Sequence, residues 1–153
     1  MAENFVFDKD HVKNINDAAS EHEANNLTRM SDYFVEKNGQ QFAGIHLLID
    51  FWEATNLSDR VKVEKALKDA AIAANATIIK SKIKKYSENG GITGILILAE
   101  SHMSIHTWPE LSFAAIDIFM CGSCNPYNCI AALQQAFEPR NTKIFERQRG
   151  VFP

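Results

Sequence analysis

Hydrophobic and polar residues alternate in blocks along most of this chain, and the blocks predict a definite order of elements. Five apolar runs rich in strand formers predict strands over residues 43–52, 77–86, 93–99, 112–120 and 142–149. Helical spacing of apolar residues follows the capping residue Asp59 through about residue 75, and a second helix is predicted to start at Asn125–Pro126. This order favours an α+β two-layer sandwich with a largely antiparallel sheet and both helices on one face.

Residues 1–40 differ from the rest of the chain because they are polar and their apolar residues follow no strong period. We expect an N-terminal extension with one or two helices, ending near Asn38–Gly39, where glycine can adopt a left-handed cap. The remaining residues, 41–153, are predicted to form one domain. A chain of 153 residues with 46% apolar content is long enough for a single core.

Charge and composition narrow the classes of function. The formal net charge of −3 provides no field that would attract a polyanion, so we expect no nucleic-acid partner, and the lysines of residues 77–86 indicate a solvated strand. No apolar run approaches the roughly 20 residues that span a bilayer, and the N-terminus does not resemble a signal peptide. We therefore expect no membrane association and a cytoplasmic location, where the three cysteines would remain free thiols.

The most reactive side chains gather in residues 100–110, a polar stretch between two apolar runs. Ser101 lies near two histidines and a carboxylate, which suggests a nucleophile, although a turn serine with hydrogen-bonded histidines explains the pattern equally well. A conventional hydrolase is poorly supported because the chain lacks the Gly-x-Ser-x-Gly elbow.

Three cysteines follow this stretch closely. Cys121 and Cys124 form a Cys-x-x-Cys pair, which admits a thiol-redox or zinc interpretation. Zinc would require two further ligands at characteristic spacing, and none stands there, so we expect no metal. Cys129 is interpreted as a small apolar residue of the second helix.

A longer pattern resembles the signature of the prokaryotic S-adenosylmethionine decarboxylase proenzymes. It runs from Glu100 to Glu110, continues through residues 114–122, and extends back through residues 91–94 and, more weakly, 44–53. The resemblance covers residues 43–150 and leaves the N-terminal extension outside.

The resemblance implies that the chain cleaves itself between Glu100 and Ser101. Ser101 would attack the carbonyl group of Glu100, and elimination from the resulting ester would convert Ser101 into an N-terminal pyruvoyl group. Residues 1–100 and 101–153 would then be separate subunits. A pyruvoyl ketone can form a Schiff base with a substrate amine and act as an electron sink, here for decarboxylation of S-adenosylmethionine to the aminopropyl donor of spermidine synthesis.

By the same resemblance, particular residues acquire roles. His106 matches the histidine that assists processing, and Thr93 matches a processing hydroxyl that is usually serine. Cys121 matches the catalytic cysteine that protonates the α-carbon after decarboxylation. These assignments make Glu100, Ser101, Thr93 and His106 the processing residues, and Ser101, His106 and Cys121 the catalytic ones.

Three further residues are expected to bind substrate. Glu110 matches the carboxylate that binds the ribose hydroxyl groups. Tyr86 falls where the family carries an aromatic that stacks on adenine, although an ordinary core or edge aromatic is an alternative. Asp50 stands where relatives commonly carry glutamate, so its carboxylate is shorter by one methylene.

The resemblance also implies a dimer of cleaved protomers with the active site near the interface. Other functions stay open at this point. The same fold could decarboxylate a free amino acid such as ornithine or arginine, because pyruvoyl chemistry accepts any suitably held α-amino acid. The chain could also be a homologue that does not process itself and acts only as a regulatory partner.

Overall fold

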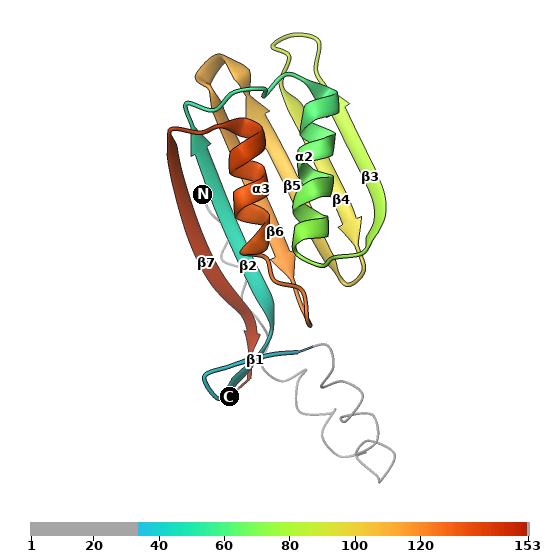
Figure 1. The fold of residues 1–153 in the computed structure, drawn as a ribbon, viewed down its shortest axis with the longest axis vertical. Helices are drawn as coiled ribbons and strands as arrows, with labels where there is room; N and C mark the ends of the chain where they lie inside the picture. Colours follow the sequence, from blue (N-terminus) through green and yellow to red (C-terminus); the bar gives the residue numbers. More distant parts are fainter. Residues whose placement is uncertain (1–33, 153) are drawn as a thin grey trace, which may run out of the picture. The chain divides into compact units, whose positions relative to one another are not determined.

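Seven strands pair into one antiparallel sheet in the computed structural model, which describes residues 34–152 (Figure 1). The strands are β1 (Val35–Lys37), β2 (Gln40–Trp52), β3 (Ile78–Lys85), β4 (Ile92–Leu98), β5 (Ser101–Trp108), β6 (Phe113–Met120) and β7 (Asn141–Val151). Across the sheet the order is β7, β2, β6, β5, β4 and β3, and β1 pairs with the first residues of β2. Each of these pairings is antiparallel.

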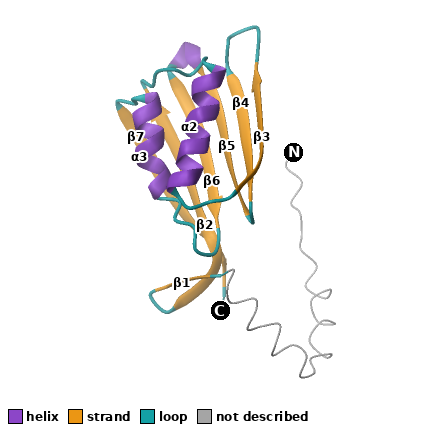
Figure 2. Ribbon diagram, turned by 45° about the vertical axis from the view of Figure 1, so that its right-hand side comes forward, coloured by secondary structure: helices purple, strands orange, loops and turns teal. Residues whose placement is uncertain are grey.

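Two helices, α2 (Arg60–Ala73) and α3 (Asn128–Phe137), lie together over one face of this sheet (Figure 2). The Asp59 side chain caps α2 by accepting hydrogen bonds from the backbone N–H groups of Val61 and Lys62, as the sequence predicts. The predicted α+β two-layer sandwich is confirmed. Neither helix, nor any other within residues 34–152, is long and apolar enough to cross a membrane.

Side chains along each strand point alternately to the helix-covered face and to a second face, which no helix of the described residues covers. On β2, for example, Leu47, Ile49 and Phe51 are buried beneath the helices. We call the second face the open sheet face. It carries large apolar side chains that remain 36–48% exposed, namely Leu48, Trp52, Ile95, Ile97, Trp108 and Phe145.

The polar stretch that begins at residue 101 is itself a strand, β5, which the sequence reasoning did not predict. Its residues alternate between buried and more exposed positions, with Met103 and Ile105 in the core. The imidazole groups and the Ser104 hydroxyl lie on the side facing away from the core, whereas the Ser101 and Thr107 hydroxyls occupy buried positions. Polar groups on both sides of the strand obscured its period of two. β5 pairs with β4 from Leu98↔Ser101 onward, so only Ala99 and Glu100 form the connection.

The strand β1 replaces a predicted helix end. Residues 35–37 are extended and pair with residues 40–42, so the helix expected to end near Asn38–Gly39 is wrong there. Asn38 and Gly39 instead form the hairpin turn, with φ values of 57° and 75° that suit an Asn-Gly pair. The remainder of the predicted helical extension lies in residues 1–33, outside the described residues.

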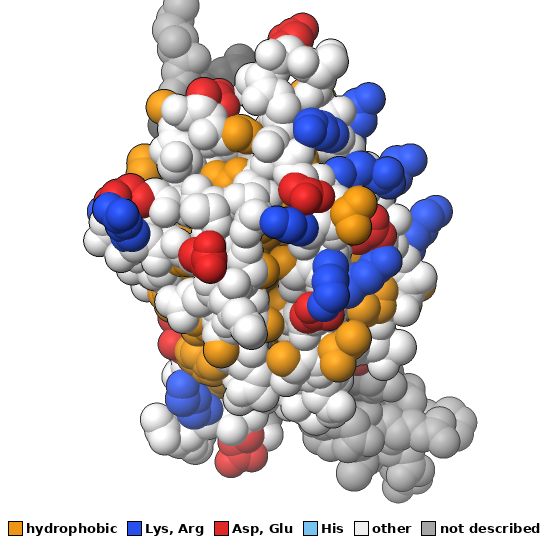
Figure 3. All heavy atoms as spheres, turned by 45° about the horizontal axis from the view of Figure 1, so that its top comes forward, with side chains coloured by type: hydrophobic (Ala, Val, Ile, Leu, Met, Phe, Trp, Pro, Cys, Tyr) orange, Lys and Arg blue, Asp and Glu red, His pale blue; other side chains and the backbone are white. Residues whose placement is uncertain are grey.

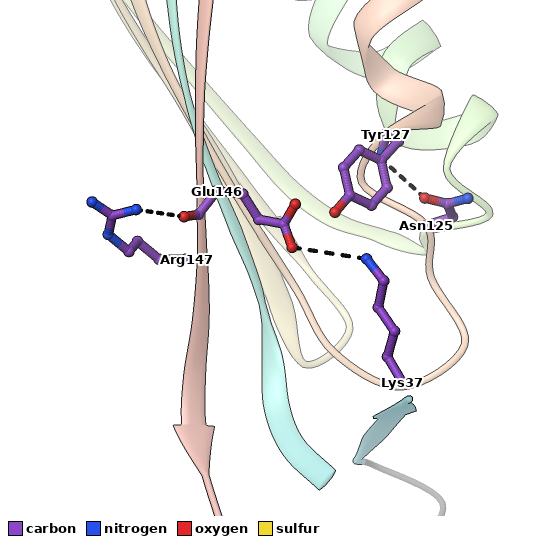
Figure 4. Close-up of polar contacts among 5 residues, drawn as sticks. All are labelled: Lys37, Asn125, Tyr127, Glu146 and Arg147. Carbon is purple, nitrogen blue, oxygen red and sulfur yellow. Dashed lines mark hydrogen bonds and ion pairs between the residues drawn. The ribbon is translucent and has the colours of Figure 1, made fainter. Parts of the chain in front are cut away.

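A polar cluster joins β1, β7 and the segment before α3 (Figure 4). The Lys37 ammonium lies 3.9 Å from a carboxylate oxygen of Glu146 and 5.6 Å from the centre of the Tyr127 ring. Burial, together with a hydrogen bond to Glu146, raises the pKa of Tyr127 to about 12. Asn125 accepts a hydrogen bond from the backbone N–H of Tyr127, which orders the entry to α3.

The opposite edge of the sheet is β3, whose lysines are exposed and gather with those of α2 on the right-hand side of Figure 3. Acidic side chains lie among them, and Glu64 pairs with Lys68 at 2.7 Å. Lysines on an edge strand oppose pairing with another sheet. The mixed charges fit a solvated edge.

Candidate active site

The expected cleavage site lies at the tight turn between β4 and β5. Glu100 has a left-handed backbone conformation, with φ of 61°, and Ser101 is the first residue of β5 and is 8% exposed. The backbone N–H of Ala99 donates to the carbonyl of Thr77 at 2.9 Å, which fixes the turn to the segment before β3.

Cys121, at the end of β6, contacts both sides of the Glu100–Ser101 bond. Its thiol donates to the carbonyl oxygen of Glu100 at 2.6 Å and lies 3.7 Å from Ser101 Oγ. The backbone N–H of Cys121 also donates to Ser101 Oγ at 3.4 Å. We call Glu100, Ser101 and Cys121 the hairpin cluster.

A second group of expected site residues surrounds a cavity of about 400 Å³ at the other end of β5. Thr93 on β4 and His106 on β5 are cross-strand partners, and Thr93 Oγ1 lies 3.0 Å from His106 Nδ1 in a hydrogen bond. Tyr86 and Trp108 line the same cavity and supply aromatic surface. Both Tyr86 and His106 are exposed.

Glu110 lies beside this cavity in a short 3₁₀ helix, η3 (Pro109–Leu111), that follows β5. Its carboxylate accepts a hydrogen bond of 3.2 Å from the Asn89 side-chain amide. The Asn89 side-chain oxygen in turn accepts from the backbone N–H of Gly91 at 3.0 Å. Asn89, which lines the cavity, therefore connects the β3–β4 turn to the carboxylate. We call Tyr86, Thr93, His106 and Glu110 the pocket cluster.

Asp50 lies in the same row of the sheet as the pocket cluster. It is opposite Ala115, which is opposite His106, which is opposite Thr93. Two strand spacings, about 10 Å, separate the backbones of Asp50 and His106. The residue between them, Ala115, carries only a methyl group as its side chain.

The structure therefore divides the expected processing residues into two groups. Ser101 and His106 are five positions apart on one extended strand, which corresponds to about 17 Å. They also lie on opposite sides of the sheet, because residues an odd number of positions apart alternate in direction. Within one protomer, His106 is out of reach of the Glu100–Ser101 bond.

The three cysteines have different surroundings. Burial and the nearby groups of Cys121 and Glu100 raise the pKa of the Cys124 thiol above its usual value. Cys129 on α3 is fully buried, its thiol donates to the Ala70 carbonyl oxygen of α2 at 3.3 Å, and burial raises its pKa to about 12. Among residues 34–152, no three His, Cys, Asp or Glu side chains come close enough to hold a metal ion.

Two residues at the pocket were not identified from the sequence. Asn89 was interpreted only as part of a turn. Its hydrogen bond with Glu110 joins residues 21 positions apart, and no sequence motif near Asn89 indicates that contact. Trp108 lies inside the signature but was given no role. The ring centre of Trp108 lies 5.3 Å from that of Phe113, and the ring centre of Phe113 lies 4.2 Å from that of Trp52. The three rings form a continuous apolar surface.

Comparisons with known proteins identify the family of the chain. A family model described as S-adenosylmethionine decarboxylase matches residues 45–150. The S-adenosylmethionine decarboxylase proenzyme of Thermomicrobium roseum is 39% identical over 109 residues, covering 71% of this chain and 94% of that protein. The proenzyme of Methanococcus aeolicus is 42% identical over 110 residues, covering 70% and 93%.

A solved structure is also similar. The crystal structure of the adenosylmethionine decarboxylase from Aquifex aeolicus matches with a TM-score of 0.62 and 31% identity, over 72% of this chain and 92% of that one. The chain belongs to the S-adenosylmethionine decarboxylase family. The family resemblance inferred from the sequence is thereby confirmed, while the roles of single residues stay predictions.

Proposed function

We propose that this chain is a proenzyme that cleaves itself between Glu100 and Ser101 and then decarboxylates S-adenosylmethionine by means of a pyruvoyl group. The product would be the aminopropyl donor for spermidine synthesis. The main support is that one thiol, that of Cys121, contacts both the Glu100 carbonyl oxygen and the Ser101 hydroxyl group. These are the two groups that must react with each other.

The turn geometry supports the cleavage step. A left-handed conformation at a residue other than glycine costs roughly 1–2 kcal/mol, and breaking the Glu100–Ser101 bond would release that strain. Ser101 Oγ would attack the Glu100 carbonyl carbon, and the C–N bond would break as an ester forms. The Cys121 thiol is positioned to donate to the oxygen on which negative charge develops.

The residues around Ser101 fit a pyruvoyl group at the new N-terminus. When present, that ketone supplies an electron sink for the electrons left by carbon dioxide. Residue 101 begins a strand and pairs with Leu98 of β4, and the β6 ladder begins at the next residue, His102, so the group would be held at the end of both ladders. Cys121 would hold the proton that the α-carbon of the substrate receives, because its thiol contacts residue 101.

The pocket cluster supports a nucleoside substrate. Tyr86 and Trp108 offer aromatic faces for a base, and Glu110 offers two carboxylate oxygens for a ribose diol. Asn89 holds one of those oxygens and so orients the carboxylate. Ornithine and arginine have neither a base nor a diol, and the features of this cavity give no reason to prefer them.

Two cleaved protomers would form the active unit. The hairpin cluster and the pocket cluster occupy opposite ends of β5. Each active site would therefore combine the hairpin cluster of one protomer with the pocket cluster of the other. A two-fold axis crossing the strands near the middle of β5 would bring the Ser101 end of one protomer to the His106 end of its partner. The exposed apolar side chains of the open sheet face support burial against a second copy of that face.

A denaturing mass spectrum tests the cleavage. We expect two fragments, residues 1–100 and 101–153, the second reactive toward hydrazine because it carries a ketone. Ser101→Ala should stay intact, whereas Ser104→Ala, on the same strand, should be cleaved. An intact, hydrazine-unreactive wild-type chain would overturn the proposal.

Carbon dioxide release tests the substrate. The cleaved protein should release it from S-adenosylmethionine, and not from ornithine or arginine. Release from one of the free amino acids alone would assign the chain to the alternative activity. Cleavage without release from any of the three would contradict the decarboxylase assignment.

A further inference from the structure

The Cys121-x-x-Cys124 pair has a second thiol that the proposed reaction does not use. Cys124 is partly buried, forms no disulfide within residues 34–152, and packs against the hydrophobic core. It follows the expected proton donor by three residues. The question is whether the two thiols can reach each other.

The backbone between the two cysteines is a tight turn formed by Gly122 and Ser123, with Gly122 at φ of 62°. A β-turn keeps its first and fourth Cα atoms within about 7 Å. Disulfides bridge Cα separations of about 4.4–6.8 Å, so this turn brings Cys121 and Cys124 into that range. The raised pKa of Cys124, which is caused in part by Cys121, is a second sign of their proximity.

The present side-chain directions keep the thiols apart. Cys121 Sγ donates to the Glu100 carbonyl oxygen, whereas Cys124 Sγ donates to the Asn75 carbonyl oxygen at 3.5 Å. Pairing would require both side chains to rotate about the Cα–Cβ bond and to give up these hydrogen bonds. A disulfide and an active Cys121 thiol are therefore mutually exclusive.

We propose that Cys121 and Cys124 form a reversible disulfide that withdraws the Cys121 thiol from the active site under oxidising conditions. The oxidant is a low-molecular-weight disulfide. The consequence for activity rests on the proposed function of Cys121, but formation of the disulfide does not.

The exchange proceeds in two balanced steps. The Cys121 thiolate attacks one sulfur of the small disulfide, forming a mixed disulfide and releasing one small thiol. Cys124 then loses its proton and attacks Cys121 Sγ, forming the protein disulfide and releasing the second small thiol. Two protein thiols are oxidised and one small disulfide is reduced. The raised pKa of Cys124, caused first by burial, lowers the thiolate fraction of that residue and disfavours it as the first thiol to react.

The experiment uses the purified full chain in buffers of graded reduced and oxidised glutathione. Free thiols are alkylated under denaturing conditions after acid quenching, and the masses of the cysteine peptides are measured. In the most oxidising buffer we expect Cys121 and Cys124 to escape alkylation together, while the buried Cys129 is alkylated. Decarboxylation should fall about 100-fold in parallel and return on reduction, because general acid catalysis is lost.

Cys124→Ser is the matched variant. It should be as active as wild type in reducing buffer, and in oxidising buffer it should carry glutathione on Cys121 with no internal disulfide. Cys124→Ala provides the same comparison if the serine variant folds poorly. A wild-type chain that carries glutathione on Cys121 while Cys124 stays alkylated would overturn the proposal. If the chain never decarboxylates, the alkylation pattern still decides whether the disulfide forms.

Discussion

The two ends of β5 differ in nearly every physical respect. At the hairpin end, Ser101 is buried and the backbone is forced into a left-handed turn that contacts Cys121. At the pocket end, His106 is exposed and the cavity is bounded by the β3–β4 turn and η3. A rigid, strained end suits bond making and breaking, whereas an accessible end suits substrate recognition. In the proposed dimer, the two functions would meet across protomers.

The largest effect is expected when each protomer of a mixed dimer carries one inactivating substitution. Ser101→Ala and His106→Ala should each be inactive alone. Produced together, they should regain about a quarter of wild-type decarboxylation, because half of randomly mixed dimers are heterodimers with one intact site of two. Activity is measured on the co-purified mixture.

The control is a mixture of Ser101→Ala with Cys121→Ser. Both residues belong to the hairpin cluster, so no heterodimer contains an intact site and activity should not rise above the low level of Cys121→Ser alone. Equal rescue in both mixtures would contradict the assignment of the two clusters to different protomers.

A charge on the open sheet face should separate the protomers and with them the two ends. Ile97→Lys adds an unpaired charge where the side chain is 46% exposed, and we expect a monomer with little cleavage. Ile72→Lys, on the outer surface of α2 at 66% exposure, is the matched control and should remain dimeric. Light scattering and denaturing mass spectra report both properties. A dimeric, cleaved Ile97→Lys protein would place the interface elsewhere.

Removing the thiol at the hairpin end should affect chemistry and spare binding. Cys121→Ser should lower kcat per cleaved chain about 100-fold with little change in KM, because a hydroxyl is a much weaker acid than a thiol. Cys124→Ala, three residues away, should retain full kcat in reducing buffer. The reverse outcome, with Cys124 essential and Cys121 dispensable, would exchange their roles.

A substitution at the pocket end should change KM and leave kcat unchanged, and its effect should be the smallest of these predictions. Asn89→Asp keeps the acceptor for the Gly91 N–H but replaces the amide donor to Glu110 by a repelling carboxylate. We expect KM for S-adenosylmethionine to rise about 3- to 10-fold with kcat unchanged. An analogue lacking the ribose hydroxyl groups should be insensitive to the substitution. A change in kcat alone would contradict a positioning role.

Much of the fold followed from local patterns. The predicted strand runs located β2, β3, β4, β6 and β7, the Asp59 cap located the start of α2, and the signature at residues 100–122 identified the family. The strand β5 was missed because its polar residues carry the functional groups and hide its period of two. The hairpin at Asn38–Gly39 was missed because glycine after a polar segment suits a helix end as well as a turn.

The family, the bond at which cleavage is expected and the chemical types of the site residues follow from the sequence alone, because contiguous motifs carry them. Which of those residues come into contact depends on the tertiary fold. Cys121 reaches the Glu100–Ser101 bond because the β5–β6 pairing returns the chain to the start of β5. His106 does not, because an extended strand carries it about 17 Å away in only five residues.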